Sequence, residues 1–447
     1  MATLWNRAGL LALASVSAVA AGFAVQRSPL IALALASIPL VFLAVDKITW
    51  SSRSMLFASF VVLLASSVPW RSQDGAQVGA ATVDDSASVW KLLLTAASVT
   101  VAVLAGERHR LAWAQQLLLG YAVVAAGGAY VATGGNIQDA TARPARYILT
   151  VIAVAMITRA VGFSLVARWT AVFAASVATL SLLARGAGFA EGQRLGGWPI
   201  PMHPNVPGSI AAAGLLCAVG LWAMRAASAG FAFLVSGGCA VALILTGSRT
   251  SIAATVVAMF LVIALPAATT VRGVRVAASL AFVLVVVAIT QSIVGSKSVF
   301  STVLTRAGQD ANYATITTRK AELDAVKRAH DTLGSQLLGA GMETKSAPLQ
   351  MQDRYFYAPV DGTWSAAYLS AGIAGLALLF AAMCLAFRRI ASAAETRTLS
   401  SLLLVYVAAA TLTFNVLNDV TFEAVLFVVA TTVGVRHTTQ GQPKAHV

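Results

Sequence analysis

The stretch "QRLGGWPIPMHPNVPG", residues 193–208, separates two long apolar runs and decides how the chain is built at that point. Its prolines, Pro199, Pro201, Pro204 and Pro207, exclude a regular helix, because each one removes a backbone hydrogen bond and clashes with the preceding turn. Irregular backbone beside hydrocarbon survives only where it is buried in protein or lines a wet cavity. The stretch therefore predicts a cavity at one face of a membrane protein.

Composition supports a membrane location for the whole chain. Of the 447 residues, 58% are hydrophobic and only 11% are charged, and the mean hydropathy is +0.79, which excludes an ordinary soluble domain. The net charge of +14 comes from scattered Lys and Arg residues, so we expect anionic lipid or a phosphate-bearing lipid substrate as the partner, and no nucleic acid. Cys217, Cys239 and Cys384 lie in apolar runs without metal-ligand spacing, which predicts neither disulfides nor a zinc site.

Apolar windows of about 17 to 25 residues, enough to cross roughly 30 Å of hydrocarbon, predict an all-α polytopic protein with about 12 to 14 transmembrane helices. For the first window a cleaved signal peptide is the alternative, since Ala18-Val19-Ala20 follows an apolar run. The windows lie near 8–25, 29–45, 54–70, 89–106, 111–133, 147–167, 169–184, 205–224, 229–246, 250–270, 276–295, 364–387, 399–418 and 421–435.

These windows divide the chain into five parts. Residues 1–184 form the N-terminal transmembrane helices, and residues 185–295 form central helices with arginine-bearing outer loops. Residues 296–363 form a large extracytoplasmic loop, which is followed by the C-terminal transmembrane helices of 364–435 and a cytoplasmic tail, 436–447.

Positive charge sets the predicted orientation. With the N-terminus inside, the cytoplasmic connections are rich in Lys and Arg, whereas Asp74, Asp84 and Asp85 fall on the outer face. The same assignment sends residues 193–208, the "TGSRTS" turn at 246–251 and the large loop to the outer face together. The cytoplasmic residues are Lys47, Arg53, Arg108, Arg110, Arg168, Arg225, Arg272, Arg275, Arg388, Arg389, Arg397 and Arg436.

Residues on the outer segments are candidates for binding an anion. Arg249 opens a predicted helix, whose free N–H groups and dipole also attract phosphate; a snorkelling arginine is the alternative interpretation. Arg194 either lines the predicted cavity or pairs with Glu191. His203 and Asn205 are further cavity candidates, with the alternatives that Asn205 caps the next helix and that His203 is an interfacial residue.

The large loop contains a predicted amphipathic helix, "TRKAELDAVKRAHDTL", residues 318–333, on the membrane surface. In one interpretation this helix only packs against the rest of the protein. In the other, Arg319 at its start also contacts a phosphate group. Asp361 stands where the chain returns to the membrane, as a helix cap or as a base. Asp419 and Glu423, at the outer end of the last two helices, are reserve candidates whose alternative role is also capping.

The order of these features resembles the O-antigen ligase and polymerase family of bacterial membrane glycosyltransferases. The matching features, across about residues 190–380, are Arg194 before a Pro/Asn element, the "GSR" turn, "LLGAG" at 337–341, and Gly372-Ile-Ala-Gly375 after the large loop. In the ligases a His-Asn pair precedes the Gly-x-x-Gly motif, whereas this chain has Asp361-Gly362 there. The resemblance implies a GT-C-like fold in the bacterial cytoplasmic membrane, with the active site on the extracytoplasmic face.

The resemblance also implies a reaction. Such enzymes transfer a glycan from a polyprenyl diphosphate carrier, with inversion, to an acceptor hydroxyl on a glycan or a lipid. Arg194 and Arg249, with Arg319 in addition, would stabilise the leaving diphosphate without a metal ion or other cofactor, and Asp361 would accept the hydroxyl proton. The missing His-Asn pair favours a polymerase over a ligase.

Two other classes of function stay open at the level of the sequence. A metal-dependent glycosyltransferase would hold a divalent cation on an early outer loop, where Asp84-Asp85 offers ligands. A secondary transporter or lipid flippase usually shows internal repeats and polar residues near the midplane. The chain shows no convincing repeat, and its polar residues gather at one face.

Overall fold

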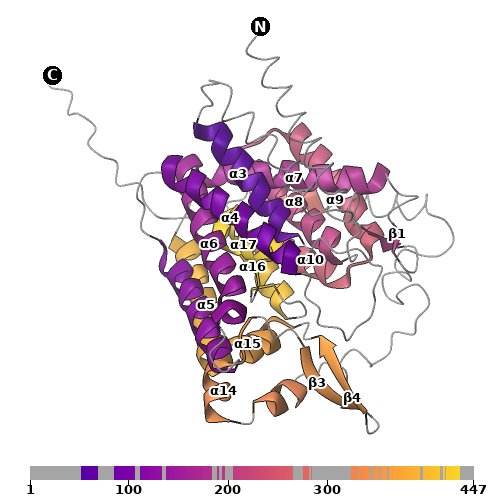
Figure 1. The fold of residues 1–447 in the computed structure, drawn as a ribbon. Coiled ribbons are helices and arrows are strands. Elements are labelled where there is room, and N and C mark those ends of the chain that lie inside the picture. Colours follow the sequence, from indigo (N-terminus) through magenta and orange to yellow (C-terminus); the bar gives the residue numbers. More distant parts are fainter. Residues whose placement is uncertain are drawn as a thin grey trace.

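The structure is a computed structural model, and it consists almost entirely of helices (Figure 1). The residues that it describes are 52–68, 85–105, 111–132, 137–183, 189–190, 194–196, 205–264, 275–280, 283, 324–330, 332–342, 346–351, 354–359, 362–392, 396–412, 416–417 and 419–432.

The described helices follow the predicted windows in order. Two short antiparallel hairpins join them: β1 (Phe189–Ala190) pairs with β2 (Arg194–Leu195), and β3 (Ser346–Met351) pairs with β4 (Arg354–Pro359). The all-α fold class is confirmed, and the hairpins are small additions to it; the aromatic run of 354–359 forms one of their strands. The helices are α3 (Ser52–Ser67), α4 (Asp85–Ala105), α5 (Trp113–Ala132), α6 (Ile137–Val161), α7 (Phe163–Leu183), α8 (Asn205–Ala223), α9 (Ala229–Thr246), α10 (Arg249–Ala264), α14 (Leu333–Leu338), α15 (Thr363–Ser392), α16 (Arg397–Thr411) and α17 (Phe422–Thr431).

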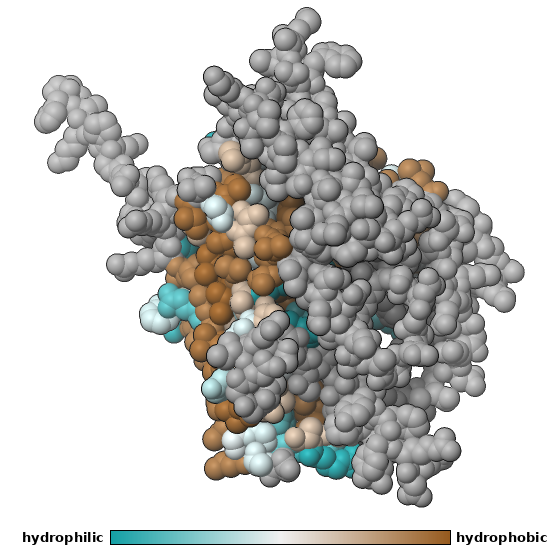
Figure 2. Space-filling view, viewed as in Figure 1, coloured by the Kyte–Doolittle hydropathy of each residue, from teal (hydrophilic) through white to brown (hydrophobic). Residues whose placement is uncertain are grey.

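The helices have the properties of membrane spans. Six described helices, α5 to α9 and α15, are long and apolar enough to cross a bilayer, and α3, α4, α10, α16 and α17 are shorter apolar helices. Large apolar side chains face outward, such as Val123 at 61% and Phe380 at 63% exposure, and Figure 2 shows an apolar face along α4, α5 and α6. The chain is therefore a polytopic membrane protein. The predicted windows 8–25 and 29–45 lie outside the described residues, so the span number stays a prediction.

Helix α8 forms the centre of the bundle, and nearly all of its side chains are buried. Small residues let other helices approach it closely, as is usual where membrane helices pack. A Cβ atom at Gly214 would lie 2.5 Å from Cβ of Ala174 in α7, and one at Gly220 would lie 2.5 Å from Cδ1 of Leu399 in α16. The positions of α7 and α16 therefore depend on glycine at these two sites.

Helix α6 begins at Ile137, ten residues before the predicted window of 147–167. Arg143, Pro144 and Arg146 lower the hydropathy of this first part, which is why the sequence placed it in a connection. Instead, both arginines belong to a helix of the bundle.

Helix α15 is broken at Gly372, whose backbone has φ 60° and ψ −158°. In an unbroken helix the carbonyl groups of Leu369 and Ser370 would accept hydrogen bonds from the amides four residues later. Here they accept from the large loop instead: Ala340 N donates to Leu369 O, and Gly341 N donates to Ser370 O, both at 2.8 Å. The "LLGAG" segment thus satisfies the backbone that the break in α15 releases.

Glycine makes this contact sterically feasible on both sides. A Cβ atom at Gly372 would lie 2.4 Å from the carbonyl group of Leu337, and one at Gly128 of α5 would lie 2.1 Å from the carbonyl oxygen of Leu338. Gly339 and Gly341 have φ of 74° and 93°, a region that other residues rarely adopt. The segment 337–341 is therefore clamped between α5 and the break in α15; we call this contact the loop clamp.

The predicted amphipathic helix is helical over its described part, residues 324–329. Ala325 and Val326 are buried against Ala366 and Leu369 of α15, while Lys327 and Arg328 are exposed. The burial of Ala325 and Val326 agrees with a packing role, with the apolar face against α15. The helix ends before His330, however, and Leu333 begins the separate helix α14 and is exposed, so the predicted extent to residue 333 is wrong. Residues 318–323, including Arg319, lie outside the described residues.

The loop clamp predicts a sharp difference between two neighbouring glycines of α5. Gly128→Ala should destabilise the protein by about 3 kcal/mol, because the new methyl group overlaps the Leu338 carbonyl. Gly127→Ala should be neutral or stabilising by up to about 1 kcal/mol, since nothing lies within 4 Å of the added atom. Unfolding in detergent, followed by the reactivity of the buried thiols of Cys217 and Cys239, measures both. Equal effects of the two substitutions would contradict the clamp.

Candidate functional site at one end of the bundle

Contacts between distant segments bring the outer features of the sequence to one end of the bundle. Ser209, in the first turn of α8, lies 3.4 Å from Ser251, in the first turn of α10, measured between the Oγ atoms. Thr363, at the start of α15, accepts a hydrogen bond of 2.8 Å from Val416 N, before α17. The start of α8, the "GSR" turn and the end of the large loop therefore share this end, as the sequence predicted. Figure 1 shows α14, β3 and β4 together at the same end.

The opposite end carries basic residues that the sequence assigned to the cytoplasmic side. Arg168, at the start of α7, donates to the carbonyl oxygen of Ala226, between α8 and α9. Arg275 donates to Trp222 O at 2.9 Å and also lies over the Trp222 ring, 5.6 Å from its centroid. The two ends of the bundle are thus chemically distinct.

The "TGSRTS" segment is a tight turn between two helices, as predicted. Gly247 ends α9 in the left-handed conformation, with φ 56°, and its N–H donates to Ile244 O. Arg249 is the first residue of α10 and is half-buried. Gly208 allows this turn to approach α8, because a Cβ atom there would lie only 2.7 Å from Cβ of Ser248. Arg249 is therefore held at a fixed position beside the start of α8.

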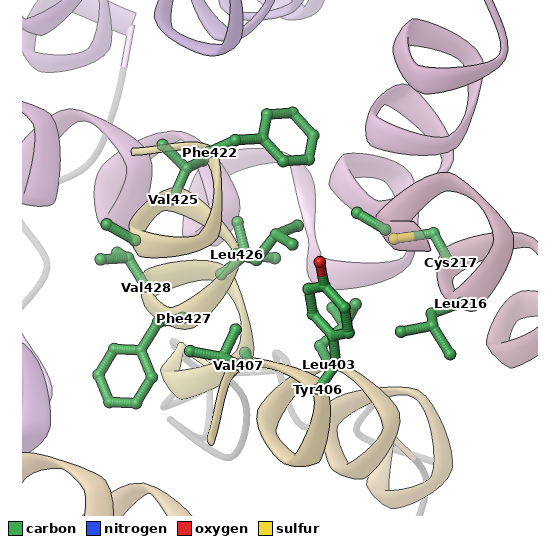
Figure 3. Close-up of a cluster of buried hydrophobic side chains, with 14 of the residues drawn as sticks. Leu216, Cys217, Leu403, Tyr406, Val407, Phe422, Val425, Leu426, Phe427 and Val428 are labelled. Atoms are coloured by element: carbon green, nitrogen blue, oxygen red, sulfur yellow. The ribbon is translucent and has the colours of Figure 1, made fainter. Parts of the chain in front are cut away.

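Five buried polar residues meet next to this turn, and we call them the hydroxyl cluster: Ser209, Ser248, Ser251, Tyr406 and Glu423. Ser248 donates to Ser251 at 3.0 Å between the Oγ atoms. The carboxyl group of Glu423, in the first turn of α17, interacts with the Ser209 hydroxyl. The Tyr406 hydroxyl points from α16 into the space between α17 and α8, close to Ser209 and Ser251 (Figure 3). Four helices thus contribute polar groups to one point in an apolar core.

A second group of polar residues, which we call the arginine cluster, lies around the connection between α16 and α17. Arg143 donates to Met342 O at 3.1 Å, and Arg146 donates to Ser66 O at 2.8 Å. Tyr147 donates to Leu417 O at 2.8 Å. Asp419 interacts electrostatically with Arg146 and Tyr147. The N-terminal part of α6 is therefore tied to α3, to the large loop and to the α16–α17 connection.

The sequence did not single out Arg143, Arg146, Tyr406 or the serines. The available signal was the spacing of the two arginines, three residues apart, which places both on one helix face beside an apolar run. That signal was missed because the segment was assigned to a connection. Tyr406 lies in an apolar run and carries no signal of its own.

The two reserve candidates, Asp419 and Glu423, do not cap α17. The cap is Thr421, whose side chain accepts from Ala424 N at 3.1 Å. Asp419 accepts from the neighbouring Val420 N at 2.7 Å and belongs to the arginine cluster, whereas Glu423 is buried in the hydroxyl cluster. Both carboxylates therefore lie at the same end of the bundle as Arg249.

The remaining predicted site residues are mostly outside the described part of the chain. Asp361, Arg319 and His203 are not described. The backbone of Arg194 forms strand β2, which packs against α9, and its neighbour Leu195 is fully buried. Asn205 is the first residue of α8 and is half-buried. The convergence of the Arg194 and Arg249 side chains stays a prediction.

Within the described ranges, no three His, Cys, Asp or Glu side chains come together in a way that would hold a metal ion. Asp84 lies outside these ranges, and for Asp85 only the backbone is described. A metal site formed by Asp84 and Asp85, as the metal-dependent alternative requires, therefore lies outside the described side chains.

Fold and site together define a polytopic helical membrane protein with a polar, arginine-bearing site at one end. Comparison of the chain with protein-family models, with curated proteins and with solved structures finds no match.

The two clusters predict different effects of removing a tyrosine hydroxyl. Tyr147→Phe should cost about 1 to 2 kcal/mol of stability, because it leaves the buried carbonyl group of Leu417 without its donor. Tyr406→Phe should change stability by less than about 0.5 kcal/mol, since the Tyr406 hydroxyl lies near Ser209 and Ser251 but makes no hydrogen bond of good geometry with either. Both side chains are fully buried, so each variant is the control for the other in the same thiol-reactivity assay. A larger loss for Tyr406→Phe would show that its hydroxyl is bonded.

Proposed function

We propose that the protein is a metal-independent inverting glycosyltransferase of the bacterial cytoplasmic membrane. It transfers a glycan from a polyprenyl diphosphate carrier to an acceptor hydroxyl on the outer face, as a polysaccharide polymerase of the O-antigen type. The observation that carries the proposal is the meeting of the segments with the family-like motifs at one end of the bundle. Arg249 is held there beside α8, and the "LLGAG" segment is bonded to the helix with the Gly-x-x-Gly motif.

The arginines would supply the electrostatic part of the reaction. A diphosphate leaves readily when the charge that develops on its oxygens is stabilised, and fixed guanidinium groups in a low-dielectric site do this without a metal ion. In the proposal Arg249 and Arg194 bind the diphosphate, with Arg319 as a further contact. Arg146 lies at the same end, where its charge is partly offset by Asp419 and its buried Nε atom has no hydrogen-bond partner among the described residues.

The acceptor hydroxyl must lose a proton as it attacks the donor sugar. Asp361 is the proposed base, since Gly362 leads directly into α15 at the site end of the bundle. Glu423 is the reserve base. Its burial among serine hydroxyls gives it a defined position, but the described contacts tie it to Ser209 rather than to an open surface.

Arginine substitutions test the proposed function directly. In purified protein supplied with a polyprenyl diphosphate-linked glycan, Arg249→Ala and Arg194→Ala should each lower turnover by about 100-fold or more, because each removes a charge that stabilises the leaving group. Chelation of divalent cations with EDTA should leave turnover unchanged. The measurement is the length distribution of carrier-linked glycan with time.

Arg328→Ala is the matched control, since this exposed arginine lies on the helix that packs against the start of α15. It should express and react like the unsubstituted protein. Near-normal turnover in both arginine variants would overturn the site assignment. Loss of turnover with EDTA, together with an active Arg249→Ala variant, would favour the metal-dependent alternative.

The product separates polymerase from ligase. A ladder of lengths on the same carrier is expected for a polymerase, whereas one modified acceptor lipid is the product of a ligase. Movement of the lipid-linked glycan between leaflets without any new glycosidic bond would favour a flippase instead.

A further inference from the structure

The carboxyl group of Glu423 lies where three helices of the bundle begin. Ser209 is near the start of α8, Ser251 is in the first turn of α10, and Glu423 is the second residue of α17. The start of a helix presents N–H groups and the positive end of the helix dipole, which favour a hydrogen-bond acceptor. A side chain that accepts hydrogen bonds, such as the carboxyl group of Glu423, is therefore electrostatically favoured at this point.

A chain of hydroxyl contacts connects this carboxyl group with the turn that carries Arg249. Glu423 interacts with the Ser209 hydroxyl. The Ser209 Oγ atom lies 3.4 Å from the Oγ atom of Ser251, which accepts a hydrogen bond of 3.0 Å from the Ser248 hydroxyl. Ser248 directly precedes Arg249, and Ser251 follows it in the same turn of α10. The chain of contacts therefore holds the turn on both sides of the arginine.

Burial makes each of these contacts important for the position of the turn. Ser248 and Ser251 are fully buried, and Ser209 and Glu423 are only 3% and 7% exposed. In such surroundings water does not replace a lost contact, so a polar group that loses its partner is left unsatisfied. Removal of the Glu423 carboxyl group would therefore affect Ser209 first and, through Ser251, the turn that carries Arg249.

The same contacts argue against a direct chemical role for Glu423. A general base must come within hydrogen-bond reach of the hydroxyl that it deprotonates. The carboxyl group of Glu423 instead interacts with the side chains of Ser209 and Thr421 and with its own backbone. The Tyr406 hydroxyl, which points into the space between α17 and α8, lies close to the same serines (Figure 3). These contacts place the carboxyl group inside the protein.

We propose that Glu423 is a positioning residue, which fixes the turn that carries Arg249 by way of Ser209 and Ser251. The inference rests on the proposed function, in which Arg249 stabilises the leaving diphosphate. Electrostatic stabilisation of a leaving group requires donors that are already held in place when the reaction begins. Glu423 supplies this restraint from α17, a helix that is distant from Arg249 in the sequence.

Hydrogen exchange of the full-length protein in detergent tests the restraint itself. Glu423→Ala and Ser209→Ala should each speed exchange of the amides of residues 247–252 about tenfold, because each breaks the chain of contacts. Ser400→Ala is the matched control, since Ser400 is fully buried in α16 and its hydroxyl has no hydrogen-bond partner among the described residues. It should leave this exchange unchanged. Unchanged exchange in Glu423→Ala and Ser209→Ala would overturn the positioning role.

Turnover of the polyprenyl diphosphate-linked glycan distinguishes a positioning residue from a base. Glu423→Ala should lower turnover about tenfold, because the turn loses its restraint. Glu423→Gln keeps an acceptor oxygen in the same place and should stay within about threefold of the unsubstituted protein. Removal of a base would cost about 100-fold or more in both variants. Equal losses of that size in Glu423→Ala and Glu423→Gln would overturn the proposal in favour of a base.

A double substitution shows whether Glu423 acts through its neighbour. If the carboxyl group acts by way of Ser209, Glu423→Ala combined with Ser209→Ala should lower turnover no further than the more damaging of the two changes alone. Losses that multiply would overturn the chain of contacts. Absence of transfer by the unsubstituted protein would overturn the proposed function alone, and the exchange of residues 247–252 would still decide whether Glu423 positions the turn.

Discussion

The site end of the structure depends on a backbone exchange between the large loop and α15. A helix that crosses hydrocarbon normally bonds its own carbonyl groups, and the break at Gly372 releases two of them within α15. Ala340 and Gly341 supply the replacement donors. The glycines at 128, 339, 341 and 372 leave no room for side chains at the contact. With this exchange the loop becomes part of the bundle, and it contributes the Met342 carbonyl that binds Arg143.

The charged groups described in this bundle lie toward its two ends, and the two ends differ in the sign of the charges that they contain. At the site end, Asp419 offsets the charge of Arg146, and serine hydroxyls surround Glu423. At the other end Arg159 and Arg389, which carry the same charge, interact electrostatically. Between them, α8 presents small and aliphatic residues in every direction. An apolar middle with polar ends is what a bilayer requires, because uncompensated charge costs most at the centre.

Much of the fold was predictable, because long apolar runs leave few options. The windows near 111–133, 205–224 and 229–246 match α5, α8 and α9 closely, and the turn after Thr246 was located correctly. The predicted start of α6 was wrong, because its first turns contain Arg143 and Arg146. Charged residues lower the hydropathy of a segment even when the folded protein provides hydrogen-bond partners for them. The "LLGAG" and Gly-x-x-Gly motifs lie at the loop clamp. Their spacing in the sequence does not reveal that the first donates hydrogen bonds to the residues before Gly372. The buried hydroxyl of Tyr406 depends on the packing of four helices, and no local pattern encodes it.

The loop clamp also fixes one part of the large loop to the membrane helices. Residues 337–342 are held by α5, α6 and α15, and Gly362 directly precedes α15, where its carbonyl oxygen accepts from Ala366 N. The β3–β4 hairpin is therefore attached to the bundle at two fixed points. Under the proposed function, a change in the length or sequence of this hairpin would alter the surface near the site without moving the two points at which the large loop joins the membrane helices.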